Sequence, residues 1–216
     1  MNRPIRGVAV AAMIMFAALL VNVSYLYVGQ QGYLSERPEN RRVTDARFAQ
    51  DRGPIMVGNT PVAASKPVDD RYKFQRSYSN GKLYAPVTGF YSYLYRTSDL
   101  ESSRSAELSG QDDSQFLQRL INMAAGSTVP GGTVETTLDA KAQKAAWDAL
   151  DGRKGAVVAI DVKTGAVKAL VSYPSYDPND LATHDLDAST AAWKRLNADP
   201  DKPMANRATA EIYPPG

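Results

Sequence analysis

The sequence predicts an α+β fold made of a single N-terminal transmembrane helix, a β-rich pedestal domain, and the first helix and β-hairpin of a third, incomplete domain. Three observations lead to this prediction. A long uncharged run opens the chain, tyrosines and β-branched residues then gather around turn signals, and an Ala-rich helical pattern precedes two Val-rich runs. We place the boundaries at residues 1–30 for the cytoplasmic tip and anchor, 31–134 for the pedestal and 135–216 for the third domain.

The uncharged run extends from Val8 to Val28. As an α-helix it would be about 30 Å long, which matches the hydrocarbon thickness of a bilayer. Arg3 and Arg6 precede the run and Glu36 is the first charge after it, so the positive-inside rule predicts a cytoplasmic N-terminus and an extracytoplasmic remainder. The alternative is a cleaved signal peptide, whose apolar region is usually only about 7–15 residues long and ends at an A-x-A-like site. Since this run is longer and lacks such a site, we predict a single-pass anchor in the cell membrane.

The pedestal carries strand and turn signals. MVGNTPVAAS predicts two short strands joined at Gly58-Asn59, and YKFQRSYSNGKLYAPVTGFYSYLY predicts a second hairpin that turns at Asn80-Gly81. We interpret the tyrosines of this run as strand-forming side chains rather than as a ligand platform. Apolar residues at helical spacing predict a helix over 114–126. The Gly/Pro/Thr-rich run TVPGGTVETT (128–137) is then interpreted as a link at the domain boundary.

The third domain begins with a helix over AKAQKAAWDAL, for which Asp139 is the predicted N-cap and Gly152 the stop. Its predicted buried face consists of Ala142, Ala145, Ala146, Ala149 and Leu150. GAVVAID and AVKALVSY predict two strands joined by a turn at 162–165, followed by the loop YPSYDPND and an amphipathic stretch around Trp193. The two strands are apolar on both faces, as covered strands are, and one helix is too small to cover them. We therefore predict that residues 136–216 pack poorly when expressed alone.

Composition removes several kinds of chemistry. The chain has no cysteine, which excludes disulfides, thiolate zinc sites and Cys nucleophiles. Its single histidine, His184, lies in a polar loop where we expect it to be solvated, and one histidine cannot form a multi-His metal site. The net charge is +2 without a basic cluster, which is not the footprint of a nucleic-acid-binding protein. We predict no cofactor, no metal and no nucleic acid.

Two strings match active-site motifs of serine transpeptidases and β-lactamases, and neither is placed to act. Lys163-Thr164-Gly165 matches K-T-G but lies in the predicted hairpin turn. Ser79-Asn80-Gly81-Lys82 matches S-x-x-K, which requires Ser and Lys on one helical face, but it crosses the other predicted hairpin turn. The pairs Asp69-Asp70 and Asp112-Asp113 are interpreted as turn or cap residues. We predict no catalytic residue within the chain.

Three strings stand in a fixed order along the last third of the chain: TTLDAKAQKAAWDAL, GAVVAIDVKTGAVKALVSYPSYDPN and NRATAEIYPPG. Together they resemble the opening of the transpeptidase domain of class B penicillin-binding proteins. The single anchor, the Arg52-Gly53-x-Ile55 segment and LSGQDDSQFLQRL also fit this family. The chain is most similar to the penicillin-binding protein A branch, which lacks the D-R-N-G continuation after R-G-x-I, and GNTPVA stands at that place here. The resemblance spans nearly the whole chain.

The resemblance implies a membrane-anchored enzyme that cross-links peptidoglycan stem peptides outside the membrane through an acyl-serine and that binds β-lactams as substrate mimics. It also implies that Y-P-P-G runs into the catalytic S-T-x-K helix, so the nucleophile is expected immediately after Gly216. We therefore expect the chain alone to be non-catalytic, with division or elongation proteins as partners in the complete protein. Two alternatives remain open, a short non-catalytic anchored module that binds cell-wall or division partners, and an unrelated exported binding protein that shares the hairpin by chance.

Overall fold

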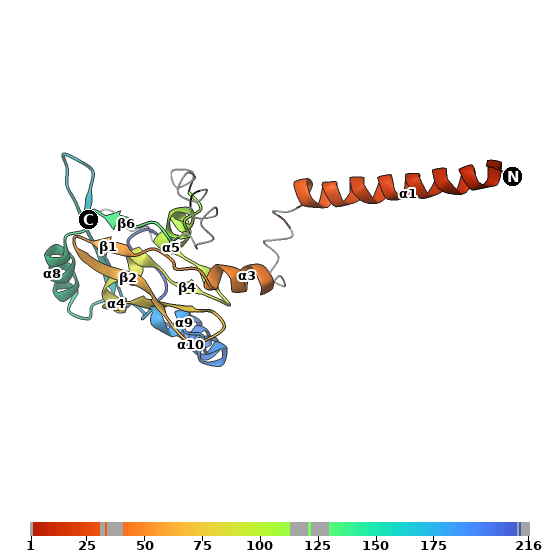
Figure 1. The fold of residues 1–216 in the computed structure, drawn as a ribbon. Coiled ribbons are helices and arrows are strands. Elements are labelled where there is room, and N and C mark those ends of the chain that lie inside the picture. The colour runs from red at the N-terminus through yellow and green to blue at the C-terminus, as the bar shows by residue number, and fades with distance from the viewer. Residues whose placement is uncertain are drawn as a thin grey trace. The chain divides into compact units, whose positions relative to one another are not determined.

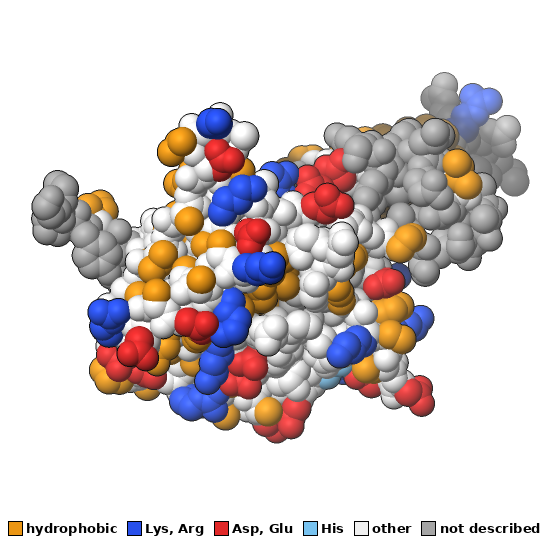
Figure 2. All heavy atoms as spheres, turned by 90° about the vertical axis from the view of Figure 1, so that its left-hand side faces the viewer, with side chains coloured by type: hydrophobic (Ala, Val, Ile, Leu, Met, Phe, Trp, Pro, Cys, Tyr) orange, Lys and Arg blue, Asp and Glu red, His pale blue; other side chains and the backbone are white. Residues whose placement is uncertain are grey.

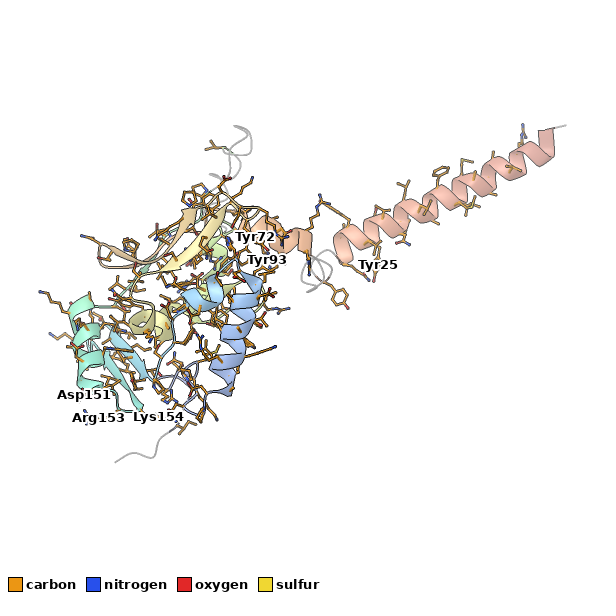
Figure 3. The ribbon with its side chains drawn as sticks, turned by 90° about the horizontal axis from the view of Figure 1, so that it is seen from below. Tyr25, Tyr72, Tyr93, Asp151, Arg153 and Lys154 are labelled. Atoms are coloured by element: carbon orange, nitrogen blue, oxygen red, sulfur yellow. The ribbon has the colours of Figure 1, made fainter. Side chains whose placement is uncertain are left out.

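The computed structural model describes residues 2–30, 33, 41–112, 121, 130–210 and 212, and the chain forms two compact units, Met1–Thr44 and Asp45–Gly216 (Figure 1). The first unit contains helix α1 (Asn2–Gly29). Its segment Arg6–Gly29 is 24 residues long with a mean hydropathy of 2.2 and no buried part, so by length and composition it could cross a membrane. Tyr25 lies near its C-terminal end (Figure 3). The predicted apolar helix over Val8–Val28 is confirmed.

The second unit begins within helix α3 (Arg41–Phe48) and continues into a four-stranded sheet of order β3-β2-β1-β6. The strands are β1 (Ile55–Val57), β2 (Thr60–Pro67), β3 (Phe74–Tyr78) and β6 (Val134–Thr136). β1 pairs antiparallel with β2 through Val57 and Thr60, so the predicted turn at Gly58-Asn59 is confirmed. β6 pairs parallel with β1, and part of the predicted link over 128–137 is therefore a strand.

Helix α4 (Gly81–Thr88) stands where a hairpin turn was predicted at Asn80-Gly81, and that prediction is wrong. Asn80 adopts a left-handed conformation, with φ 51° and ψ 47°, which ends β3 and redirects the chain into the helix. Gly81, Tyr84 and Thr88 are buried at helical spacing, so one face of α4 packs into the core. A Cβ on Gly81 would lie only 2.3 Å from Oδ1 of Asp177, which explains why the first helical residue is glycine.

Short elements complete the pedestal part of the unit. They are β4 (Tyr91–Ser92), β5 (Arg96–Thr97), α5 (Asp99–Ser103) and α6 (Ser105–Leu108). β4 and β5 form a separate two-stranded ribbon. The helix predicted over 114–126 lies outside the described residues, except for position 121. Asp113 also lies outside the described residues.

The last part of the chain contains a helix, a hairpin and two further helices. These are α8 (Ala140–Leu150), β7 (Gly155–Ile160), β8 (Val167–Tyr173), α9 (Asn179–Ala182) and α10 (Leu186–Ala198). The cap at Asp139 is confirmed, because its Oδ1 accepts hydrogen bonds from Lys141 N (2.8 Å) and Ala142 N (2.9 Å). The antiparallel β7–β8 hairpin and the helix around Trp193 are confirmed too.

The buried face of α8 differs from the prediction. Gln143 is fully buried, whereas Ala145 and Ala149 are exposed. The helix turns Gln143 and Trp147 toward the hairpin, and the Trp147 ring lies 5.6 Å from the ring of Tyr173. In an Ala-rich helix the alanines bury little area on any face, so the long side chains that meet the hairpin decide the orientation. Figure 1 shows α8 beside the two strands.

Candidate functional site

A buried ionic network occupies the centre of the pedestal. Both Arg52 and Arg76 pair with the carboxylate of Glu101, at 2.6 Å from Nε to Oε2 and 2.7 Å from Nε to Oε1, respectively, and Glu101 has no exposed surface. The hydroxyl of Tyr78 donates to the same carboxylate at 3.1 Å. Burial and the negative charge of Glu101 raise the pKa of Tyr78 well above its ordinary value. Since all four groups are buried, the network is internal to the pedestal and does not face a substrate.

The glycine of Arg52-Gly53-x-Ile55 allows two backbones to touch. Gly53 N donates to Leu108 O at 2.8 Å, and a Cβ on Gly53 would lie 1.9 Å from the carbonyl oxygen of Gly132. Ile55, two residues on, is fully buried in the core. In this segment Arg52 therefore supplies a positive charge to the ionic network, and Gly53 lets two backbone segments approach closely because it has no side chain. Ile55 supplies an apolar side chain to the core.

Side-chain amides attach the C-terminal part of the chain to the pedestal. Asn179 pairs with the backbone of Tyr78 as a neighbouring strand would, since Oδ1 accepts from Tyr78 N and Nδ2 donates to Tyr78 O, both at 2.9 Å. Gln143 pairs with the backbone of Leu170 in the same manner, since Oε1 accepts from Leu170 N and Nε2 donates to Leu170 O, both at 2.8 Å. Its Nε2 also donates to Leu83 O at 3.1 Å. These two residues come from two of the strings on which the family resemblance rests. No local sequence signal predicted these contacts, because their partners lie far away in the chain.

The exchange Asn179→Asp tests this attachment. It keeps the shape of the side chain but replaces the Nδ2 donor by an oxygen that faces the carbonyl of Tyr78 at 2.9 Å and the carboxylate of Asp177 at 2.8 Å. We expect a loss of about 2 kcal/mol in the free energy of unfolding, because a buried acceptor is left unpaired and two like charges approach. Denaturant unfolding of the full chain in detergent measures this loss. A change below about 0.5 kcal/mol, the level of an ordinary surface substitution, would contradict the assigned role.

The N-R-A string forms a turn next to β8 whose central residue, Arg207, is buried. Arg207 is 2% exposed, and its guanidinium donates to the carbonyl oxygens of Asp201, Lys202 and Ala205. Its backbone N–H donates to Ser172 Oγ at 3.1 Å. The string is thereby fixed to the hairpin at the place from which the chain continues toward its last residues.

The two edges of the hairpin differ. The outer edge of β8 is covered, since Asp139 N donates to Lys168 O at 2.9 Å and Gln143 pairs with Leu170. Among the described residues, β7 pairs only with β8. Val158 and Ile160, on the same face of β7, are 43% and 56% exposed. Figure 2 shows hydrophobic side chains along the projecting hairpin. In the described part of the chain the hairpin thus has one covered edge, one unpaired edge and an exposed apolar face on β7. The expected poor packing of 136–216 in isolation stays a prediction.

A groove of about 790 Å³ lies where the two predicted domains meet. Its wall combines Leu100 and Glu107 of α5 and α6, Glu135 of β6, Val167 of β8 and Asn206 of the N-R-A turn. The groove is therefore built jointly by the pedestal and by the segment that leads toward the end of the chain.

His184 is not solvated as predicted. Its side chain is 12% exposed, its Nδ1 lies 2.5 Å from Oδ2 of Asp70, and its ring packs 4.7 Å from the ring of Tyr72. The turn role predicted for Asp70 is confirmed, because its Oδ1 accepts from Tyr72 N (2.8 Å) and Lys73 N (3.2 Å). The prediction for His184 failed because it considered only the residues next to it in sequence, whereas its partners come from the loop between β2 and β3.

Three tyrosines of the pedestal, Tyr72, Tyr91 and Tyr93, form an aromatic cluster around Phe48. The Phe48 ring stacks on Tyr91 at 4.4 Å and meets the edge of Tyr93 at 5.3 Å. Burial raises the pKa of Tyr91 to about 12, and for Tyr93 desolvation and a hydrogen bond to Asp45 at 2.7 Å also raise the pKa to about 12. These side chains pack on one another, but only Tyr91 lies in a strand; Tyr72 and Tyr93 lie in turns, so the prediction that they form strands is wrong for these two.

The cluster predicts how stability depends on alkaline pH. A tyrosine in the unfolded chain loses its proton near pH 10, whereas Tyr91 and Tyr93 in the folded chain keep theirs until about pH 12. The folded state therefore binds more protons in this interval, and its stability falls as the pH rises from 10 to about 12. The absorbance of tyrosinate, measured as a function of pH, checks the two raised pKa values on which this dependence rests. Tyr91→Phe and Tyr93→Phe should each remove amplitude from the absorbance step near pH 12. Loss of amplitude near pH 10 instead would show that the two hydroxyls titrate as free ones.

Neither motif match lies in an active-site arrangement. Ser79 donates its N–H to Val62 O and so continues β3, and the left-handed Asn80 separates it from Lys82 in α4. The predicted reason, a hairpin turn, was wrong, but the string still does not place Ser and Lys in one helix. Lys163 and Thr164 lie in the hairpin turn, with Gly165 at φ 73°, as predicted. That the chain holds no catalytic residue stays a prediction.

Residues 52–134 match the penicillin binding protein A dimerisation domain, and residues 155–216 match the penicillin binding protein transpeptidase domain. Along its full length the chain is 44% identical to the peptidoglycan D,D-transpeptidase PbpA of Mycolicibacterium smegmatis. The chain belongs to the penicillin-binding protein A branch of the penicillin-binding proteins. It spans 45% of the length of that relative.

Two further relatives show how far the likeness extends. Penicillin-binding protein A of M. tuberculosis, solved as a penicillin G acyl-enzyme complex, is 43–44% identical in its different structures, and this complex has a TM-score of 0.74 over 77% of the present chain and 40% of its own. The peptidoglycan D,D-transpeptidase MrdA of Escherichia coli is 45% identical over 85 residues, which cover 39% of the chain and 13% of MrdA. The acyl-enzyme structures of M. tuberculosis penicillin-binding protein A thus share the fold of up to 80% of the chain.

Proposed function

We propose that the chain supplies the membrane anchor, the pedestal and the opening of the catalytic domain of a peptidoglycan D,D-transpeptidase. The observation that carries this proposal is the 44% identity that runs along the entire chain, together with the burial of Gln143 and Arg207 in strings typical of the family. The substrates would be stem peptides of peptidoglycan, and β-lactams would bind in their place. In this proposal, residues 1–30 anchor the protein, 31–134 form the pedestal and 135–216 begin the transpeptidase domain.

The edge of β7 that has no partner among the described residues supports the proposal that residues 135–216 begin a larger domain. Such an unpaired edge, here the one away from β8, is a site where a further strand adds in a larger sheet. The exposed side chains of Val158 and Ile160 leave one face of β7 for further packing. We infer that the remaining strands of the catalytic domain pair there. The nucleophilic serine, its lysine partner and the functional K-T-G would come from the same remaining part of the protein and not from Ser79 or Lys163.

The proposed orientation places the N-terminus in the cytoplasm and everything after α1 outside it. It rests on Arg3 and Arg6, which precede the apolar segment. Fusion of alkaline phosphatase, which is active only outside the cytoplasm, after Gly216 should give an active reporter. An inactive reporter in the presence of intact fusion protein would reverse the orientation.

Labelling with a fluorescent penicillin tests the proposed activity. The protein isolated from native membranes with an antibody against the pedestal should become labelled, and the 216-residue chain expressed alone should not. Preincubation with unlabelled penicillin G controls for specific acylation. Labelling of the short chain would place a nucleophile within it, and an unlabelled native protein would favour the non-catalytic anchored module.

A further inference from the structure

His184 lies where three segments of the second unit meet. It stands in the loop between α9 and α10, and its Nδ1 is 2.5 Å from Oδ2 of Asp70, which belongs to the loop between β2 and β3. Its ring also meets the edge of the Phe48 ring, at the end of α3, with 6.5 Å between centroids. These three residues are far apart in sequence, so only the fold brings them together.

The acceptor of this contact is held in place independently. Oδ1 of Asp70 accepts the N–H groups of Tyr72 and Lys73, which leaves Oδ2 directed at the imidazole. Desolvation raises the pKa of Asp70, but the hydrogen bonds from His184 and Tyr72 outweigh it and lower the pKa below the ordinary value. The imidazole therefore meets a fixed carboxylate that is ionised at neutral pH.

The same contact reaches the end of α3 through the aromatic cluster. Tyr72 packs 4.7 Å from His184, 5.1 Å from Tyr93 and 6.1 Å from Phe48. Figure 3 shows Tyr72 and Tyr93 side by side. Tyr93 donates its hydroxyl to Asp45 of α3, and Arg71 lies over the Tyr72 ring, 4.5 Å from its centroid. Displacement of Tyr72 would therefore disturb the end of α3 as well.

We propose that the His184–Asp70 pair is a latch that keeps the end of α3, the β2–β3 loop and the α9–α10 loop ordered as one unit. Within the part of the chain that the structure describes, the other ring nitrogen of His184 is buried and has no hydrogen-bond partner. The contact with Asp70 is thus the polar interaction that holds the ring between Tyr72 and Phe48. The latch joins the helix that follows the apolar segment in sequence to elements of both predicted domains.

Hydrogen–deuterium exchange of the full chain in detergent micelles tests the latch. Asp70→Asn removes the charge, and His184→Phe keeps an aromatic ring but removes the polar contact. Each variant should speed exchange about fivefold in peptides covering all three segments while β1 and β8 stay protected. Asp180→Asn is the matched control, because it removes the exposed ion pair with Arg195 between α9 and α10 and should change none of these segments.

The double variant distinguishes a latch from two separate roles. If the two side chains act only on each other, Asp70→Asn combined with His184→Phe should exchange no faster than either single variant. Faster exchange confined to the substituted loop, or additive effects in the double variant, would overturn the proposal. Retained protection in β1 and β8 reports that each variant is folded, so a general loss of structure would be recognised and would also count against a local latch.

Discussion

Replacement of Glu101 by alanine is expected to lower the free energy of unfolding by about 3–5 kcal/mol. The carboxylate has no exposed surface and pairs with two guanidinium groups, those of Arg52 (5% exposed) and Arg76 (3% exposed). Its removal leaves two buried positive charges close together without a counter-charge. It also deprives the Tyr78 hydroxyl of its acceptor.

Thermal unfolding of the full chain in detergent measures this effect, and we expect the Tm to fall by about 10 °C or more. Glu107→Ala is the matched control, since Glu107 lies on the neighbouring helix and pairs with Arg104 in an exposed i,i+3 bridge at 2.9 Å. Its loss should cost no more than about 0.5 kcal/mol. Similar Tm values for the two variants would contradict the assignment of the network as the structural centre of the pedestal.

Gly53→Ala is expected to cost about 3 kcal/mol or more, because the new methyl group meets backbone rather than a side chain that could move. The added Cβ would lie 1.9 Å from the carbonyl oxygen and 2.6 Å from the carbonyl carbon of Gly132. Relief requires Gly53 to move away from Gly132, which breaks the hydrogen bond from Gly53 N to Leu108 O. It would also shift Arg52, the next residue, out of the ionic network.

Gly58→Ala is the control for this exchange, because Gly58 lies in the β1–β2 turn with φ +56° and no atom within 4 Å of its added Cβ. It should cost only the penalty of a left-handed alanine, about 1–2 kcal/mol. Denaturant unfolding in detergent compares the two. A Gly53 variant no less stable than the Gly58 variant would contradict the close approach as the reason why glycine stands at position 53.

Elements that depend on local signals could be predicted from the sequence. The apolar segment of α1, the turn at Gly58-Asn59, the Asp139 cap and the β7–β8 hairpin each follow from a few adjacent residues, and all are present. The family could be recognised for a related reason, since its motifs are contiguous strings whose order along the chain is visible.

Features that depend on distant partners could not be predicted. Asn80-Gly81 is a favoured hairpin turn by itself, but Asp177 packs against Gly81, and the chain starts a helix there instead. β6 is too short to show a strand pattern and exists because β1 offers it a parallel edge. His184 appeared to be a loop residue because nothing near it in sequence reveals Asp70. Lys163 and Ser79 match catalytic patterns in letters but not in geometry, and neither was predicted to act; only the hairpin turn predicted after Ser79 was wrong.

The most direct test of the account is the gene sequence through and beyond the codon for Gly216. We predict that Ser-x-x-Lys follows in frame immediately after that codon, with S-x-N and a second K-T-G further on. The anchor, pedestal and open β7 edge described above would then belong to a complete transpeptidase. A stop codon directly after Gly216 would contradict the proposed function and would favour a short membrane-anchored module that binds cell-wall or division partners.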